Sequence, residues 1–177
     1  MSFKKSGANR GYDHTYSTGG FGYEAAREKW EDWVQRHYIG EFQLREGERI
    51  LDIPCGDGFW SSIFAKKGFE VVGIDRNATG ICEARRRFPQ IEFHLGNAED
   101  KLPVAPGSFD VVFSRAITHF HEKQLFTDRT LAMLSNLMAY VRPGGLLLVS
   151  YFSKRDGGGT EAHAYHPLDV LIKVCET

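Results

Sequence analysis

The sequence predicts an α/β domain with a mostly parallel β-sheet and helices on both of its faces. From residue 49 onward, short β-branched and aromatic runs alternate with helical patterns, and glycine or proline marks most of the junctions. The run 146–152 is apolar almost throughout, which is typical of a strand buried on both faces of a parallel sheet. Right-handed crossovers are expected to connect such strands.

Two segments precede this alternation. Residues 1–22 are rich in Gly, Ser, Tyr and charge, and we interpret them as an arm or lid. Residues 26–37 carry apolar side chains at intervals of three or four, which predicts an amphipathic helix. We therefore divide the chain into an arm with its helix, residues 1–44, and one α/β domain, residues 45–177.

The α/β domain is predicted to contain strands and helices in strict alternation over most of its length. Strands are expected at 49–54, 70–74, 91–95, 109–114 and 146–152. Helices are expected at 58–67, 78–87 and 126–141.

Composition limits the classes of function. The 177 residues carry 22 Lys and Arg against 23 Asp and Glu, a formal net charge of −1, so we expect no nucleic-acid or membrane partner. The basic run 85–87 is interpreted as a solvated helix face. No apolar run is long enough to cross a bilayer, and the polar N-terminus is not expected to be a secretory signal. Three cysteines without zinc spacing predict reduced thiols, no metal site and a cytoplasmic protein.

The segment 51–58, LDIPCGDG, is the most informative in the chain. A predicted strand ends and a helix begins here, with Gly56 and Gly58 at the turn. Glycine permits positive φ and lets a ligand lie against bare backbone, and the first N–H groups of a helix favour an anionic or polar group. Asp75 ends the next strand, where a carboxylate is placed to accept hydrogen bonds from a ribose diol. These features predict a site for an adenosine-containing ligand.

Two classes of adenosine-containing ligand compete for such a site. A dinucleotide fingerprint has a third glycine, and Ser61 stands at that position. Asp52, four residues before Gly56, would repel a pyrophosphate but would hold a cationic amino group through bound water. The pattern favours an amino-acid nucleoside, and an NAD(P)-dependent oxidoreductase stays as the less favoured alternative.

At this point the sequence resembles the class I S-adenosylmethionine-dependent methyltransferases. Five segments are similar to motifs of that family in order and spacing: 51–58, 71–75, 96–99, 108–112 and 142–145. Pro54 replaces a glycine that is frequent in the first motif. The resemblance covers about residues 45–155 and implies a Rossmann-like fold.

The resemblance implies that the cofactor is S-adenosyl-L-methionine and that the product is S-adenosyl-L-homocysteine. By analogy, Asp75 binds the ribose hydroxyls, Asn97 accepts from the adenine amino group, and Ala98 offers a backbone N–H to the ring. The implied cofactor-binding residues are Asp52, Pro54, Gly56, Gly58, Asp75, Arg76, Asn97, Ala98, Glu99 and Ser114. The implied reaction is methyl transfer from a sulfonium to an O, N or C nucleophile, which positioning and desolvation accelerate.

The acceptor is predicted by elimination to be a small molecule. Residues 114–121 lack the signatures with which similar enzymes hold flipped bases, attack pyrimidines, bind guanidinium groups or ligate metal. His119 is the candidate base or acceptor-orienting group, the alternative being a histidine at the start of a surface helix. Arg115 would bind an acidic substrate or cover the sheet edge. The predicted substrate contacts are Tyr12, Tyr16, Tyr23, Arg115 and His119.

The end of the chain departs from the family's seven-stranded pattern. After residue 152 we expect only a loop, 153–165, and a short helix, 168–176, so the C-terminal strand hairpin would be missing. Three expectations are open: a chain truncated at its C-terminus, a naturally short form, or a second copy that covers the exposed edge and makes a homodimer. A truncated or minimal form that still binds the cofactor is slightly favoured. A cofactor-binding module without catalysis is the remaining alternative.

Overall fold

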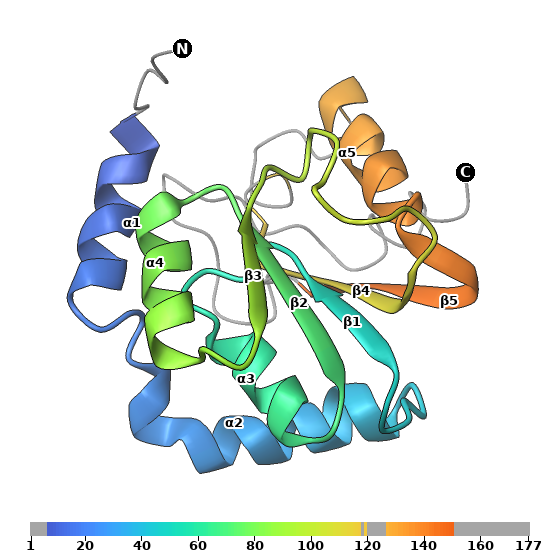
Figure 1. The fold of residues 1–177 in the computed structure, drawn as a ribbon, viewed down its shortest axis with the longest axis horizontal. Helices are drawn as coiled ribbons and strands as arrows, with labels where there is room; N and C mark the ends of the chain where they lie inside the picture. Colours follow the sequence, from blue (N-terminus) through green and yellow to red (C-terminus); the bar gives the residue numbers. More distant parts are fainter. Residues whose placement is uncertain (1–6, 118, 120–126, 151–177) are drawn as a thin grey trace.

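The computed structural model describes residues 7–117, 119 and 127–150. Within these residues a five-stranded parallel sheet has the order β3-β2-β1-β4-β5 (Figure 1). Its strands are β1 Arg49–Asp52, β2 Glu70–Asp75, β3 Glu92–Leu95, β4 Phe109–Arg115 and β5 Val141–Ser150. The strand order reverses beside β1, and in open α/β sheets ligands bind at the carboxyl ends of the strands at such a point. The loop and helix predicted after residue 152 lie outside the described residues, and the homodimer stays a prediction.

Helices cover both faces of the sheet, so the predicted Rossmann-like α/β class is confirmed. Figure 1 shows α2, α3 and α4 on one side of the sheet and α5 on the other. The α-helices are α1 Gly7–Ser17, α2 Arg27–Val34, α3 Phe59–Lys66, α4 Ala78–Arg87 and α5 Asp128–Met138. Two short helices flank α2, the 3₁₀-helix η1 Tyr23–Ala26 and the π-helix η2 Gln35–Gly40.

The packing of the core explains why the strands are continuous apolar runs in the sequence. Successive side chains of a strand point to opposite faces, and here both faces are buried. On β1, Ile50 packs with the cluster under α2, α3 and α4, whereas Leu51 packs with the cluster under α5. Val111 and Val112 of β4 divide in the same way. The sheet is thereby fixed between two layers, with its carboxyl edge left to form a site.

Within the described residues, two strand boundaries differ from the prediction by more than one residue. β1 ends at Asp52 rather than at Pro54, which lacks an N–H to donate to a neighbouring strand. β5 begins at Val141 rather than at residue 146, because residues 143–145 form a register shift in its pairing with β4 instead of a turn before the strand. A Cβ on Gly145 would lie 2.6 Å from the carbonyl oxygen of Asp110, so glycine allows this close approach of two backbones.

The N-terminal segment contains a helix that the sequence pattern does not predict. Residues 7–17 form α1, and Figure 1 shows α1 beside α4. Two glycines lower the intrinsic helix propensity of α1, so tertiary contacts must stabilise it. Among those contacts, Asp13 Oδ1 accepts hydrogen bonds from Asn77 Nδ2 at 3.0 Å and from Thr79 Oγ1 at 3.1 Å.

Candidate functional site

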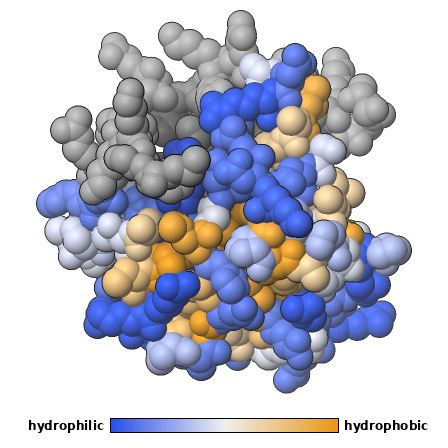
Figure 2. Space-filling model, turned by 45° about the horizontal axis from the view of Figure 1, so that its top comes forward, coloured by the Kyte–Doolittle hydropathy of each residue, from blue (hydrophilic) through white to orange (hydrophobic). Residues whose placement is uncertain are grey.

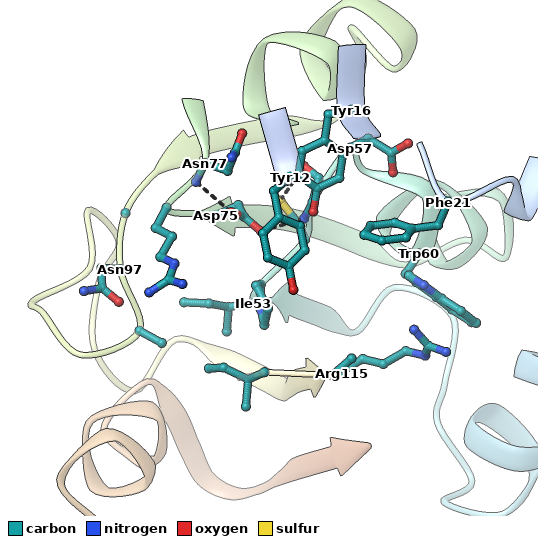
Figure 3. A pocket seen from close by; sticks show the side chains of 18 of the residues that line it. Tyr12, Tyr16, Phe21, Ile53, Asp57, Trp60, Asp75, Asn77, Asn97 and Arg115 are labelled. Carbon is teal, nitrogen blue, oxygen red and sulfur yellow. Dashed lines mark hydrogen bonds between the residues drawn. The ribbon is translucent and has the colours of Figure 1, made fainter. Parts of the chain in front are cut away.

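A pocket of about 420 Å³ opens at the carboxyl ends of β1, β2 and β4 (Figure 3). That volume lies in the range typical of small-molecule sites. Its walls come from the turn after β1, the end of β2, the residues after β3 and β4, and the N-terminal segment. On the face turned toward the viewer in Figure 2, hydrophobic residues gather in patches bordered by hydrophilic ones.

The two glycines of the turn after β1 have different environments. Both adopt positive φ, +57° at Gly56 and +79° at Gly58. A Cβ on Gly56 would lie 2.8 Å from the Tyr16 hydroxyl oxygen, at the pocket wall. A Cβ on Gly58 would instead lie 2.8 Å from the Phe93 ring, in the core, and Gly58 does not line the pocket. Gly56 is therefore a pocket residue, whereas the contact of Gly58 with the cofactor stays a prediction.

Asp75 joins β2 to the turn after β1. Its Oδ2 accepts a hydrogen bond from Gly56 N at 2.9 Å, and its Oδ1 accepts one from Asn77 N at 2.7 Å. The side chain is buried yet lines the pocket. Burial raises the pKa of Asp75, and the two backbone donors oppose that effect. A carboxylate has more than two acceptor sites, so Asp75 still has capacity toward a ligand.

Asp52 lies behind the pocket wall. It is 1% exposed, does not line the pocket, and accepts a hydrogen bond from Ser61 Oγ at 2.5 Å. Ser61 lies in the first turn of α3, so this hydrogen bond connects the end of β1 to that helix. Asp52 therefore supports the turn, and its contact with the cofactor stays a prediction.

The remaining predicted cofactor contacts differ in whether they line the pocket. Arg76, Asn97 and Ala98 line the pocket, as does Pro54 from the turn after β1. Glu99 does not line it. Nor does Ser114, which is fully buried within β4. The cofactor contacts of Glu99 and Ser114 stay predictions.

Glu99 instead pairs with two side chains. Its carboxylate accepts from Arg129 Nε at 2.8 Å and Nη2 at 2.7 Å, and its Oε1 lies 3.2 Å from His119 Nε2. These hydrogen bonds from Arg129 are the main reason that the pKa of Glu99 is lowered. His119 is 4% exposed and lines the pocket, so it is not a solvent-exposed surface residue.

Aromatic side chains from the N-terminal segment form one wall of the pocket. Tyr12, Tyr16, Phe21 and Tyr23 all line it, and the Tyr12 and Tyr16 ring centroids are 6.1 Å apart. Tyr16 is the most deeply buried of the four, and burial raises its pKa. Trp60 extends this wall from α3, with its ring centroid 5.9 Å from that of Tyr23.

Arg115 completes the wall from the end of β4. Its guanidinium carbon lies 4.2 Å from the centroid of the Trp60 ring and 5.6 Å from that of Tyr23. All five predicted substrate contacts therefore line the same pocket as six of the ten predicted cofactor contacts.

Some pocket residues are missing from the sequence-based prediction. The principal ones are Phe21, Asp57, Trp60 and Asn77. Asn77 carried a readable signal, since it caps the N-terminus of α4 and follows the motif acid by two residues. No such signal marked Trp60 and Phe21. An aromatic residue in a helical pattern is normally interpreted as core packing, and one in a loop as an exposed residue.

Two observations concern other classes of site. Among the residues that the structure describes, no cluster of three or more His, Cys, Asp or Glu is arranged to hold a metal ion. No helix in the same residues is long and apolar enough to cross a membrane.

The residues present fit an adenosyl amino acid. Because Gly56 has no Cβ, a ligand can lie close to the backbone of this turn. Asp75 beside it provides carboxylate acceptors for a diol. Asn97 adds an amide, and Ile53 and Ala98 add apolar surface for a planar base. The donor and acceptor set thus matches sugar, base and amino-acid groups.

Comparison with known proteins identifies the family. Residues 50–145, more than half of the chain, match a family model described as "Methyltransferase domain". A demethylmenaquinone methyltransferase of Beutenbergia cavernae is 38% identical over 119 residues, which are 67% of this chain and 47% of that protein. A tRNA U34 carboxymethyltransferase of Pseudomonas aeruginosa is 32% identical over 118 residues, 64% of this chain and 36% of that protein. The chain thus spans about half or less of the length of these curated relatives.

A solved structure shows the same fold. Haemonchus contortus Phospholethanolamine N-methyltransferase 2, in complex with phosphomonomethylethanolamine and S-adenosylhomocysteine, superposes with a TM-score of 0.62 at 21% identity. The match covers 89% of this chain and 36% of that one. The family model and the fold agree, and the chain belongs to the class I S-adenosylmethionine-dependent methyltransferases.

Proposed function

We propose that this protein binds S-adenosylmethionine in the described pocket and transfers its methyl group to an O, N or C atom of a small-molecule acceptor. One observation carries the proposal. The 2.9 Å hydrogen bond from Gly56 N to Asp75 Oδ2 joins the bare turn of the first motif to the buried acid of the second. That juxtaposition supports a ligand with a ribose beside a small charged group.

In this proposal Asp75 binds the ribose, and Asn97 and Ala98 contact the adenine. The turn at Gly56 takes the amino-acid end of the cofactor, and Tyr16 covers it. Arg76 is exposed and lies on the rim of the pocket next to Asp75. When bound, the cofactor supplies an electrophilic methyl group on a sulfonium.

A small acceptor is supported by the aromatic lining of the pocket. Aromatic side chains from η1, α1 and α3 line it, and such a wall suits a compact organic molecule. The near-neutral formal charge gives no general attraction to a polyanion. The named relatives include a demethylmenaquinone methyltransferase and a tRNA carboxymethyltransferase, so the acceptor class rests on this chain's own pocket and charge.

His119 is the proposed residue that orients the acceptor or takes its proton. It lines the pocket, and its Nε2 lies 3.2 Å from Glu99 Oε1. A base is needed only where the acceptor carries a proton at working pH. Its supporting partner Glu99 is held in turn by Arg129.

Calorimetric titration with S-adenosylhomocysteine tests the binding proposal. We expect binding by the wild-type protein, none of NADH or NADPH, and a loss of about 1.5–3 kcal/mol in Asp75→Ala, the scale of hydrogen bonds to a charged acceptor. Asp32→Ala, which removes an exposed aspartate of α2, is the matched control. Unchanged affinity in a folded Asp75→Ala variant would remove the ribose assignment, and binding of NADH instead would support an oxidoreductase.

Catalysis requires a second measurement. Transfer of label from methyl-labelled S-adenosylmethionine into a small-molecule extract would separate an enzyme from a binding module. Absence of transfer to every fraction, with normal binding of S-adenosylhomocysteine, would favour the module.

A further inference from the structure

Phe21 is an exposed aromatic side chain on the wall of the pocket. It lies in the loop between α1 and η1, lines the cavity, and is 51% exposed. Single apolar side chains are common on protein surfaces, but this one borders a cavity of small-molecule size. The exposed part of Phe21 is therefore apolar surface that a molecule in the pocket can bury.

Phe21 lies beyond the residues proposed for the cofactor. Figure 3 shows Asp75 and Asn97 toward one side of the cavity and Phe21 toward the other. The side chain at the turn after β1 is Tyr16, whose hydroxyl oxygen would lie 2.8 Å from a Cβ on Gly56. Phe21 thus borders the part of the pocket that the nucleoside leaves to the acceptor.

Neighbouring rings hold the Phe21 ring in place. Its centroid lies 5.8 Å from that of Tyr16 at an interplanar angle of 86°, and 6.1 Å from that of Tyr12 at 67°. The Tyr23 centroid is also 5.8 Å away, at 36°. Aromatic pairs prefer edge-to-face or offset arrangements with centroids about 4.5–7 Å apart. A planar ring that enters the pocket can add one more contact of the same kind.

The groups around Phe21 favour an uncharged acceptor. Burial raises the pKa of Tyr16, so its hydroxyl stays neutral at working pH. Asp57 also lines the pocket, but its Oδ2 is paired with Arg87 Nη1 at 2.7 Å. The aromatic wall thus offers ring surface and neutral hydroxyls, which an uncharged ring with a small polar substituent can match.

A cationic acceptor is the main alternative, because aromatic walls also bind ammonium groups. The guanidinium carbon of Arg115 already lies over two of the rings, 4.2 Å from the Trp60 centroid and 5.6 Å from the Tyr23 centroid. A second cation on those ring faces would have to displace it. Stacking of an uncharged ring on Phe21 needs no such displacement.

We propose that the methyl acceptor carries an uncharged aromatic ring, which stacks against Phe21 at the acceptor end of the pocket. Phe21 is thereby a residue that determines specificity for the acceptor. This inference rests on the proposed function, because it names the class of acceptor for that same site.

Binding of small ring compounds to protein saturated with S-adenosylhomocysteine tests the inference. The probes are phenol, cyclohexanol and cyclohexylamine, titrated by ligand-observed NMR near neutral pH. Phenol and cyclohexanol share ring size and one hydroxyl, so the difference between them reports the aromatic ring. We expect phenol to bind about two- to tenfold more tightly than either saturated compound, the range for one aromatic pair.

Substitutions at Phe21 locate the contact. Phe21→Leu keeps an apolar side chain and should remove the preference for phenol, whereas Phe21→Tyr should retain it. Phe42→Leu is the matched control, at a phenylalanine that is 43% exposed and does not line the pocket, and it should leave every probe affinity unchanged. The affinity for S-adenosylhomocysteine should stay within about twofold in all three variants, because Tyr16 covers the turn at Gly56.

Several results would overturn the acceptor class while leaving the methyltransferase proposal intact. They are equal binding of phenol and cyclohexanol, no binding of phenol, and an unchanged preference in Phe21→Leu. Tightest binding of cyclohexylamine would replace the uncharged ring by a cationic acceptor. Loss of S-adenosylhomocysteine binding in Phe21→Leu alone would assign Phe21 to the cofactor instead. Failure of the wild-type protein to bind S-adenosylhomocysteine would overturn both proposals.

Discussion

Asp52 is a carboxyl group that the fold removes almost completely from water. Burial is the dominant influence and raises the pKa of Asp52 to about 7, while the hydrogen bond from Ser61 opposes it. A raised pKa means that the folded protein holds a proton that the unfolded chain releases at lower pH. The pH dependence is therefore the reverse of that of a salt-bridged aspartate.

The free energy of unfolding should fall as pH rises from about 4, the pKa of an aspartate in the unfolded chain, to about 7. Asp52→Asn should remove this contribution, which is worth roughly 1–4 kcal/mol on the scale of 1.36 kcal/mol per pKa unit. Urea unfolding at pH 5 and pH 8 measures it. Equal pH sensitivity in the wild type and in Asp52→Asn would show that Asp52 titrates as it does in the unfolded chain.

His119 offers a different residue-level prediction, because its proposed role concerns the reaction and not the cofactor. His119→Ala should lower methyl transfer by about two orders of magnitude, the lower range for a general acid or base. Its affinity for S-adenosylhomocysteine should change by less than about threefold, since the turn at Gly56 and Asp75 is untouched. Turnover of an identified acceptor and calorimetry give the two numbers. Full turnover in the variant would show that His119 has no role in the mechanism.

At the scale of elements, Arg87 connects three segments. Its Nη1 lies 2.7 Å from Asp57 Oδ2 in the turn after β1, and its Nη2 lies 2.6 Å from Glu24 Oε2 in η1. The Arg87 side chain is 17% exposed, so the interpretation of 85–87 as a solvated face is wrong for this residue. Arg85 and Arg86 agree with that interpretation, because both are exposed, although Arg85 also donates to the Phe93 carbonyl.

This ion-pair cluster holds the N-terminal segment over the pocket. Arg87→Ala should weaken binding of S-adenosylhomocysteine by about 1–3 kcal/mol, because Asp57 and Glu24 lose charge-assisted hydrogen bonds and the aromatic wall loosens. Hydrogen exchange in residues 12–24 should accelerate. Arg86→Ala, at the exposed neighbour, is the matched control. Unaltered exchange in Arg87→Ala would show that aromatic packing alone holds the segment.

At the scale of the molecule, the pocket is assembled from segments that are distant in sequence. The N-terminal tyrosines, the turn at Gly56, Asp75, Asn97 and Arg115 meet only because the parallel order β3-β2-β1-β4 brings the carboxyl ends of the strands together. The register of β1 against both β2 and β4 fixes these ends relative to one another. The position of the site therefore depends on the whole sheet.

The sequence by itself determined the fold class, the order of strands and helices in the α/β domain, and the family. These depend on local information: side-chain periodicity, β-branched runs, and glycine and proline at turns. Asp75 and Gly56 were readable for the same reason, since each stands at the end of a predicted strand.

Only the tertiary structure decided which of these residues face the cavity. It left Asp52, Gly58, Glu99 and Ser114 out of the pocket lining, formed α1 from a glycine-containing segment, and brought Trp60 against Arg115. The direction of a side chain at a turn and the packing of a distant helix depend on long-range contacts, and these leave no periodic signal in the chain.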